Sequence, residues 1–143
     1  MPALYDKLGI KFQYPENWTL DEGEALDGEL SVSVYSPGGA FWSVMVHPLS
    51  QVPQELVDTA LQTMRQVYDE LDAEAVEETI GDVELVGCDI NFYCLDLTNT
   101  AVVRSGYTPR ATLLIFWQAD DRELSSVEHV FRAITISLLD QVD

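Results

Sequence analysis

A run of five large apolar residues at positions 113–117 (LLIFW) constrains the fold more than any other stretch of this sequence. Successive side chains of a β-strand point to opposite faces of a sheet, so a strand of this composition places apolar groups on both faces. Both faces must then be covered by other elements, as they are at the centre of a buried sheet. The run therefore predicts a central strand with further structure packed above and below it.

Several other segments alternate between apolar and polar residues, which is typical of strands with one buried face, whereas residues 40–46 are apolar on nearly both sides. Together with the central strand, we predict about six strands, the others at residues 10–14, 29–35, 40–46, 86–94 and 101–107. Turns at residues 37–39 and at 98 and 99 join neighbouring strands, and tight turns favour antiparallel pairing. The residues from 21 to 28 are rich in acids and are expected to form an exposed loop.

Two segments carry apolar residues at helical spacing. The first runs from Pro53 to about residue 71, and proline suits the first turn of a helix. The second follows Ser125, whose spacing to Glu128 matches a capping box. Two long helices and a mainly antiparallel sheet predict an α+β fold, arranged as a three-layer α/β/α sandwich in a single domain over residues 1–143.

The length of 143 residues suffices for one domain with its own core. The first nine residues lack the basic start and apolar centre of a secretory signal, and no stretch approaches the roughly 18 apolar residues of a membrane helix. We therefore expect a cytoplasmic protein. Cys88 and Cys94 lie about 20 Å apart if they share one extended strand, too far for a disulfide unless the chain turns between them.

Charge is the unusual property of the chain, with 25 acidic residues against 7 basic ones and a formal net charge of −18. Such a field repels phosphate groups and argues against binding to nucleic acid or to an anionic membrane. It would attract a basic protein or a metal cation. A second interpretation also stays open, in which the acids form a solvated coat that keeps the protein soluble.

The densest acidic stretch covers residues 69–84 and contains no basic residue. It lacks the alternating ligands and central glycine of a calcium loop, so we predict no metal site and no cofactor, and we place the acids at a helix end and a strand edge. The candidate partner-binding residues are Glu70, Asp72, Glu74, Glu77, Glu78, Asp82 and Glu84, together with Trp18 and Trp42, which we expect to be exposed.

No catalytic constellation is visible in the sequence. His47 and His129 do not stand at a spacing that recruits a nucleophile or a metal. A nucleophile elbow, a zinc-protease motif, a phosphate-binding loop and a dinucleotide fingerprint are all missing. These patterns predict a protein that is not an enzyme.

Three stretches resemble the PsbP-like domains: FQYPENW at residues 12–18, VSVYSP at 32–37 and WSVMVHP at 42–48. These domains include the lumenal extrinsic protein of photosystem II, a eukaryotic Ran-binding factor and bacterial members without assigned function. Some similar bacterial domains act as chaperones for type VI secretion effectors. The resemblance covers nearly the whole chain and implies an α/β/α sandwich with mostly non-catalytic binding roles. No metal ligand or Ran-contact residue of the family matches a position here.

The leading hypothesis is therefore a non-catalytic protein-interaction module, of the adaptor or chaperone-like kind, with an acidic surface. Its partner would be a basic protein or an effector segment. The alternative is a protein that binds a small ligand or a divalent cation at residues 69–84. A third hypothesis is an enzyme whose site the known motifs do not reveal.

Overall fold

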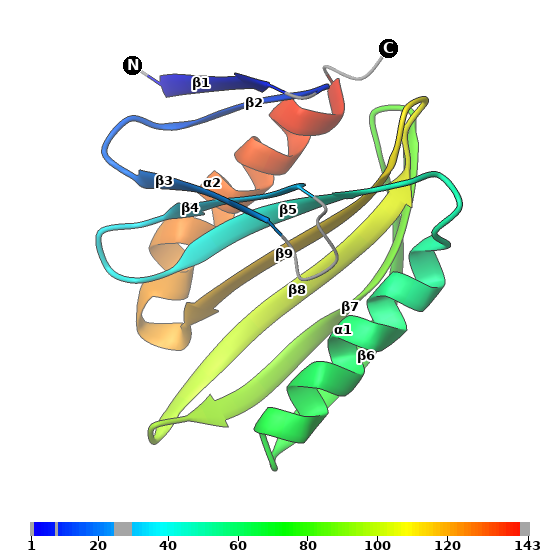
Figure 1. Ribbon diagram of the computed structural model, residues 1–143. Coiled ribbons are helices and arrows are strands. Elements are labelled where there is room, and N and C mark those ends of the chain that lie inside the picture. The colour runs from blue at the N-terminus through cyan, green and yellow to red at the C-terminus, as the bar shows by residue number, and fades with distance from the viewer. Residues whose placement is uncertain (1, 8, 25–29, 141–143) are drawn as a thin grey trace.

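The computed structural model describes residues 2–7, 9–24 and 30–140 of the chain (Figure 1). Along these residues the elements are β1 (Pro2–Lys7), β2 (Ile10–Pro15), β3 (Thr19–Glu24), β4 (Leu30–Tyr35), β5 (Phe41–His47), α1 (Pro53–Val67), β6 (Leu71–Ile80), β7 (Val83–Cys94), β8 (Leu97–Tyr107), β9 (Thr112–Asp120) and α2 (Asp121–Asp140). Seven strands form an antiparallel sheet in the order β3-β4-β5-β9-β8-β7-β6, and β1 pairs with β2 in a separate antiparallel hairpin.

The predicted fold class, an α+β fold with a mainly antiparallel sheet and two long helices, is confirmed. The prediction of about six strands is wrong, because the main sheet has seven and the hairpin adds two more. The apolar run lies in β9, which is the central strand, as predicted. Leu113 and Ile115 belong to one apolar cluster with α2, whereas Leu114 and Phe116 belong to another with α1. The two helices therefore lie on opposite faces of the sheet (Figure 1).

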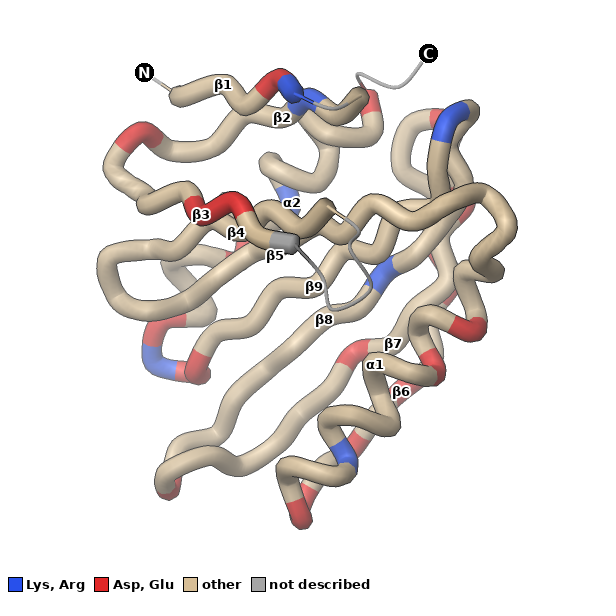
Figure 2. The backbone as a smooth tube through the Cα atoms, in the orientation of Figure 1, with Lys and Arg blue, Asp and Glu red and all other residues tan. Residues whose placement is uncertain are grey.

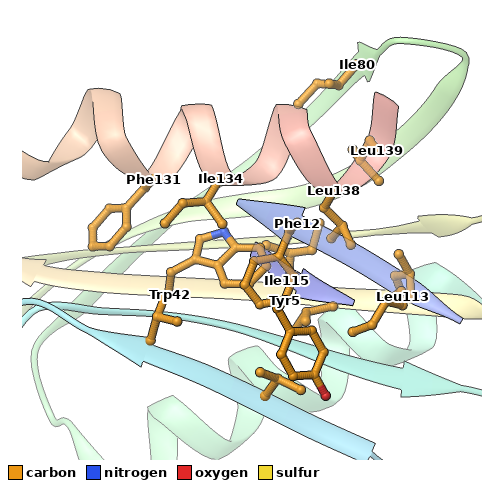
Figure 3. Packing of buried hydrophobic residues seen from close by; sticks show 14 of the residues in the cluster. Tyr5, Phe12, Trp42, Ile80, Leu113, Ile115, Phe131, Ile134, Leu138 and Leu139 are labelled. Carbon is orange, nitrogen blue, oxygen red and sulfur yellow. The ribbon is translucent and has the colours of Figure 1, made fainter. Parts of the chain in front are cut away.

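Trp42 lies at the middle of the cluster between the sheet and α2 (Figure 3). Its side chain is fully buried, and its ring centroid lies 4.9 Å from that of Phe12 on β2. The indole Nε1 donates a hydrogen bond of 3.0 Å to Thr135 Oγ1 on α2. One side chain thus joins the sheet, the hairpin and the helix.

The prediction that Trp18 and Trp42 are exposed is wrong. Trp18 is only 8% exposed, and its ring meets the ring of Phe131 on α2 edge-on, with centroids 5.7 Å apart. Both indoles are covered because α2 and the β1–β2 hairpin close over this face of the sheet. The polar residues that follow Trp18 in the sequence gave no indication of this cover.

Helix α1 begins at Pro53, as predicted, and packs Val57 and Met64 against β7 and β8. It ends at Val67 and not near residue 71. Tyr68 already has extended backbone angles (φ −117°, ψ 119°), and two acids, Asp69 and Glu70, follow it. Negative charge disfavours continuation at the negative end of a helix dipole, so the chain leaves the helix here.

Strands β1, β3 and β6 were not predicted. The acidic loop expected at residues 21–28 is partly wrong, because residues 21–24 belong to β3, and the rest of that range lies outside the described residues. Strand β6 has the sequence LDAEAVEETI, whose Asp, Glu and Ala have low strand propensity. It forms because all ten of its residues pair with β7.

Two predicted boundaries are corrected by local backbone geometry. The turn between β7 and β8 is at Leu95 and Asp96, with φ values of 52° and 62°, and not at residues 98 and 99. Helix α2 starts at Asp121 because Asp120 Oδ1 accepts the backbone N–H groups of residues 122 and 123 at 2.9 and 3.1 Å. Ser125 therefore lies inside the helix and does not cap it.

Both cysteines are free, and they lie on one strand, β7, with no turn between them. Cys88 is buried on the α1 side of the sheet, and this burial raises the pKa of its thiol. Among the described residues, neither helix has the length and apolar character needed to cross a membrane.

We predict that Trp42→Ala lowers the free energy of unfolding by about 4 kcal/mol, because it removes a fully buried aromatic ring and leaves a cavity. Urea unfolding followed by circular dichroism measures this change. Tyr93→Ala, at an aromatic residue that is 56% exposed on β7, should change the value by less than about 0.5 kcal/mol. A similar loss in both variants would contradict the central role of Trp42.

Candidate functional site

The structure distributes the predicted acidic residues over the edge of the sheet formed by β6 and its neighbours. Asp72, Glu74, Glu77 and Glu78 lie on β6, Glu84 lies on β7, Asp82 lies in the turn between these two strands, and Glu70 precedes β6. Because side chains alternate along a strand, Asp72, Glu74 and Glu78 share the α2 side of the sheet, whereas Glu77 points to the α1 side. The acidic stretch is therefore not one patch, and its members have different surroundings (Figure 2).

Arg104 on β8 is the main cation of this region. Its side chain is only 10% exposed, and its Nε donates a hydrogen bond of 2.6 Å to Glu78 Oε2. Its Nη2 donates to Asp89 Oδ1 at 2.9 Å, and its Nη1 donates to the carbonyl oxygens of Cys88 and Val103 at 3.3 and 3.0 Å. The buried guanidinium is thus paired with two carboxylates and two backbone groups, which offsets the cost of burying its charge.

Glu78 connects this network to helix α2. Its Oε1 accepts a hydrogen bond of 3.4 Å from Arg132 Nη1. Partial burial alone would raise the pKa of Glu78, but the hydrogen bond and charge of Arg104, together with the charge of Arg132, outweigh burial and hold the pKa below its usual value. Glu78 is therefore a structural acid, because both of its oxygens are already bound by cations.

Gly87 explains how Arg104 on β8 reaches across β7 to Glu78 on β6. Gly87 pairs directly with Arg104 in the sheet. A methyl group at this glycine would overlap the carbonyl oxygen of Val103 and come within 3.0 Å of Arg104 Cδ. The absence of a side chain at Gly87 leaves the path along which the arginine crosses the strand.

A polar groove of about 340 Å³ lies between this half of the sheet and α2. Its charged lining residues are Glu74, Glu78, Asp89, Arg104, Glu128 and Arg132. Thr100 Oγ1 adds hydrogen-bonding capacity there, 3.2 Å from Asn91 Oδ1 and 3.0 Å from Asp121 Oδ1. Because acids outnumber the two arginines, this groove suits a cationic group better than an anionic one.

Three acids of β6 remain available on its exposed surface. Asp72, Glu74 and Glu77 are exposed, and none of them takes part in an ion pair within residues 2–7, 9–24 and 30–140. Figure 2 shows acidic segments recurring along β6, behind α1. These three carboxylates, together with the strand edge that carries them, form what we call the β6 edge.

Across the described part of the chain, no group of three or more His, Cys, Asp or Glu side chains is arranged to hold a metal ion. Of the β6 acids, Glu77 lies on the face opposite the other three, and both oxygens of Glu78 are already bound by arginines. No described geometry therefore favours the alternative of a divalent-cation site.

Exposed apolar side chains occur near the β7–β8 turn and at the end of α1, which the sequence analysis did not predict. Leu95, at the tip of the β7–β8 hairpin, is 91% exposed, and Tyr93 and Val67 are 56% and 66% exposed. Tyr93 also lines a shallow pocket with Glu70 and Asp72, so the start of the β6 edge adjoins an aromatic ring. A correct prediction of the turn at residues 95 and 96 would have placed Leu95 at a hairpin tip.

The architecture of a seven-stranded antiparallel sheet with a helix on each face is a PsbP-like fold. The structure is similar to that of the cyanobacterial PsbP of Synechocystis sp. PCC 6803, with a TM-score of 0.62 and 15% sequence identity over 95% of this chain and 90% of that one. Because the identity is low, the likeness establishes the fold and does not assign an activity.

Two further solved structures share the fold. A protein of unknown function from Pseudomonas aeruginosa matches with a TM-score of 0.56 and 12% identity over 96% of this chain and 95% of that one. LpqN, which is involved in cell envelope biogenesis of Mycobacterium tuberculosis, matches with a TM-score of 0.52 and 13% identity over 94% and 86%. No protein-family model and no curated protein matches the sequence.

We predict that Gly87→Ala lowers the free energy of unfolding by about 3 kcal/mol, because the added methyl overlaps backbone and displaces the arginine that binds two carboxylates. Gly23→Ala on β3 is the matched control, since no atom lies within 4 Å of the added methyl there. Urea unfolding of both variants measures the difference. Equal stability of the two variants would contradict the crossing of Arg104 over Gly87.

We predict that the effect of Glu78→Gln depends on pH. Because the pKa of Glu78 is lowered in the folded state, its ionised form stabilises the fold above the pKa of the unfolded chain, and this stabilisation is lost as pH falls through the folded value. Urea unfolding should show a loss of about 1.5 kcal/mol at pH 7 and a much smaller one near pH 3. Glu70→Gln, at an exposed acid, should have little effect at either pH, and a loss from Glu78→Gln that is independent of pH would contradict the prediction.

Proposed function

We propose that this protein is a non-catalytic interaction module, of the adaptor or chaperone-like kind, that binds a basic segment of a partner protein at the β6 edge. The observation that carries the proposal is the set of three exposed acids, Asp72, Glu74 and Glu77, on a strand at the border of the sheet. Arg104 and Arg132 are bound to Glu78 and Asp89 and form no described ion pair with these three acids.

Electrostatics favours a basic partner over other classes. The net charge of −18 raises the local concentration of cationic segments and accelerates their encounter with the surface. A bound lysine or arginine would also relieve the repulsion between neighbouring carboxylates of β6. Exposed charges are screened beyond about 8 Å at physiological ionic strength, so this attraction must weaken as salt increases.

The burial of Trp18 and Trp42 narrows the choice of partner. The two indoles that were expected to bind an apolar effector segment lie inside the core. We therefore retain the basic partner and set aside the version of the hypothesis in which these tryptophans bind an effector. The cytoplasmic location expected from the sequence is compatible with this proposal and stays a prediction.

The proposal predicts that a triple variant of the β6 edge, Asp72→Asn, Glu74→Gln and Glu77→Gln, loses a partner that the unmodified protein retains. Immobilised proteins would be exposed to lysate of the source organism at low salt, and bound proteins would be released by a salt gradient. A control triple variant, Asp21→Asn, Glu55→Gln and Asp58→Asn, loses the same number of charges from β3 and α1.

The expected result is a protein held by the unmodified chain and by the control variant, released by salt and absent from the β6-edge variant. If both triple variants lost the same proteins to the same extent, the acids would act as a general coat and the proposed binding surface would be wrong. Retention that is insensitive to salt would also contradict it.

A further inference from the structure

Within the part of the chain that the structure describes, one backbone edge of strand β6 has no paired strand. On one side, all ten residues pair with β7 without interruption. On the other side, no strand among the described residues pairs with it, because β6 ends the sheet order. In an edge strand, alternate residues direct their N–H and C=O groups outward, where they can bind a further extended chain.

The opposite edge of the sheet is less available. Strand β3 has six residues, and its Glu22 is engaged by the β1–β2 hairpin. Tyr5 donates its hydroxyl hydrogen to Glu22 Oε2 at 3.1 Å, and Lys7 Nζ donates to Glu22 Oε1 at 3.2 Å. Burial, together with the hydrogen bond to Glu22, raises the pKa of Tyr5 to about 12. β6 is the longer edge, with ten residues, and among the described residues its contact of this kind with an element outside the sheet is that of Glu78 with Arg132 on α2.

The composition of β6 selects what can pair with it. Proteins usually protect an edge strand with charged side chains, proline or a bulge, and β6 has no lysine, proline or bulge, so its acidic side chains are its protection. Its charges are all acidic, so pairing with β6 of a second copy would bring carboxylates against carboxylates, which is unfavourable. A basic strand would bring opposite charges together at the same positions.

The two faces of β6 also differ in size and charge. Asp72 and Glu74 project on the α2 side, while the small side chains of Ala73 and Ala75 project on the α1 side, which Glu77 also shares further along the strand. A matching segment would therefore carry lysine or arginine at every second position, with apolar or small residues between them. Side chains at every second position of an extended chain share one face, as this pairing requires.

We propose that the basic partner binds by β-strand addition to the free edge of β6, as an eighth strand with alternating basic and apolar residues. This inference rests on the proposed function and adds the mode of binding. Backbone hydrogen bonds to β6 supply affinity, and the carboxylates of Asp72 and Glu74 select the basic face of the segment. If charge attraction alone held the segment, binding would not depend on the direction of its backbone or on its backbone N–H groups.

The test uses a ten-residue peptide in which lysine alternates with valine, and two derivatives that carry the same side chains. One derivative is N-methylated at every lysine and the other at every valine. In an extended strand, lysine and valine N–H groups point to opposite edges, and the lysine side chains must face Asp72 and Glu74. In an antiparallel eighth strand, which continues the pattern of this sheet, only one of the two series therefore points its N–H groups at β6.

Binding would be measured by fluorescence anisotropy near physiological salt. We expect one methylated peptide to bind at least tenfold more weakly than the unmodified peptide and the other to bind within about threefold of it. The β6-edge triple variant should bind the unmodified peptide at least tenfold more weakly than the control triple variant.

The outcomes distinguish a failure of strand addition from a failure of the proposed binding to a basic partner. If both methylated peptides retained binding, or if both lost it equally, strand addition would be wrong, although selective loss in the β6-edge variant would still support the basic-partner function. If the unmodified peptide bound the two triple variants equally, or bound no form of the protein, the proposed function would fail as well. Amide hydrogen exchange should show added protection at alternate residues of β6 in the complex, and its absence would also overturn strand addition.

Discussion

The arrangement of the layers depends on the burial of the Trp42 indole between β5, α2 and the β1–β2 hairpin. The ring contacts Phe12, and its N–H is bound by Thr135, so displacing any one of these elements would expose apolar area or leave a polar group unsatisfied. The aromatic side chains of Phe12, Trp18 and Phe131 extend the same cluster. The aromatic rings of this face therefore gather around β5, β9 and α2, whereas β6 and β7 contribute the aliphatic residues Ile80, Val83 and Leu85 to the same cluster.

The polar side of the sheet is organised by Arg104. Where an apolar residue would continue the core, this buried guanidinium binds Glu78 and Asp89 and reaches them across Gly87. Arg132 brings α2 into the same network through Glu78. This arrangement separates the acids into two groups. Glu78 and Asp89 hold the strands and the helix together, whereas Asp72, Glu74 and Glu77 have no described cation and face solvent.

The sequence predicted the centre of the fold better than its border, for a physical reason. The apolar run in β9 and the helical spacing of apolar residues in α1 are visible in the sequence because both segments bury much apolar area. The same burial determines which secondary structure each segment forms. The residues of β6 bury little, so their pairing depends on β7 and leaves a weak local pattern. Arg104 on β8 and Glu78 on β6 are 26 positions apart in the sequence, and Gly87 lies on β7 between these two strands. No local sequence pattern therefore indicates that the three residues belong to one network.

The acids of β6 also affect which chains can pair with this open sheet edge. An edge that can pair with a partner can pair with a copy of itself, and ten residues of unprotected backbone would favour such association. Like charge makes self-pairing unfavourable without blocking a single backbone N–H, which proline would do. The same carboxylates lower the energy of an approaching basic strand. Acidic residues at this edge can thus exclude one class of partner and select another with the same side chains.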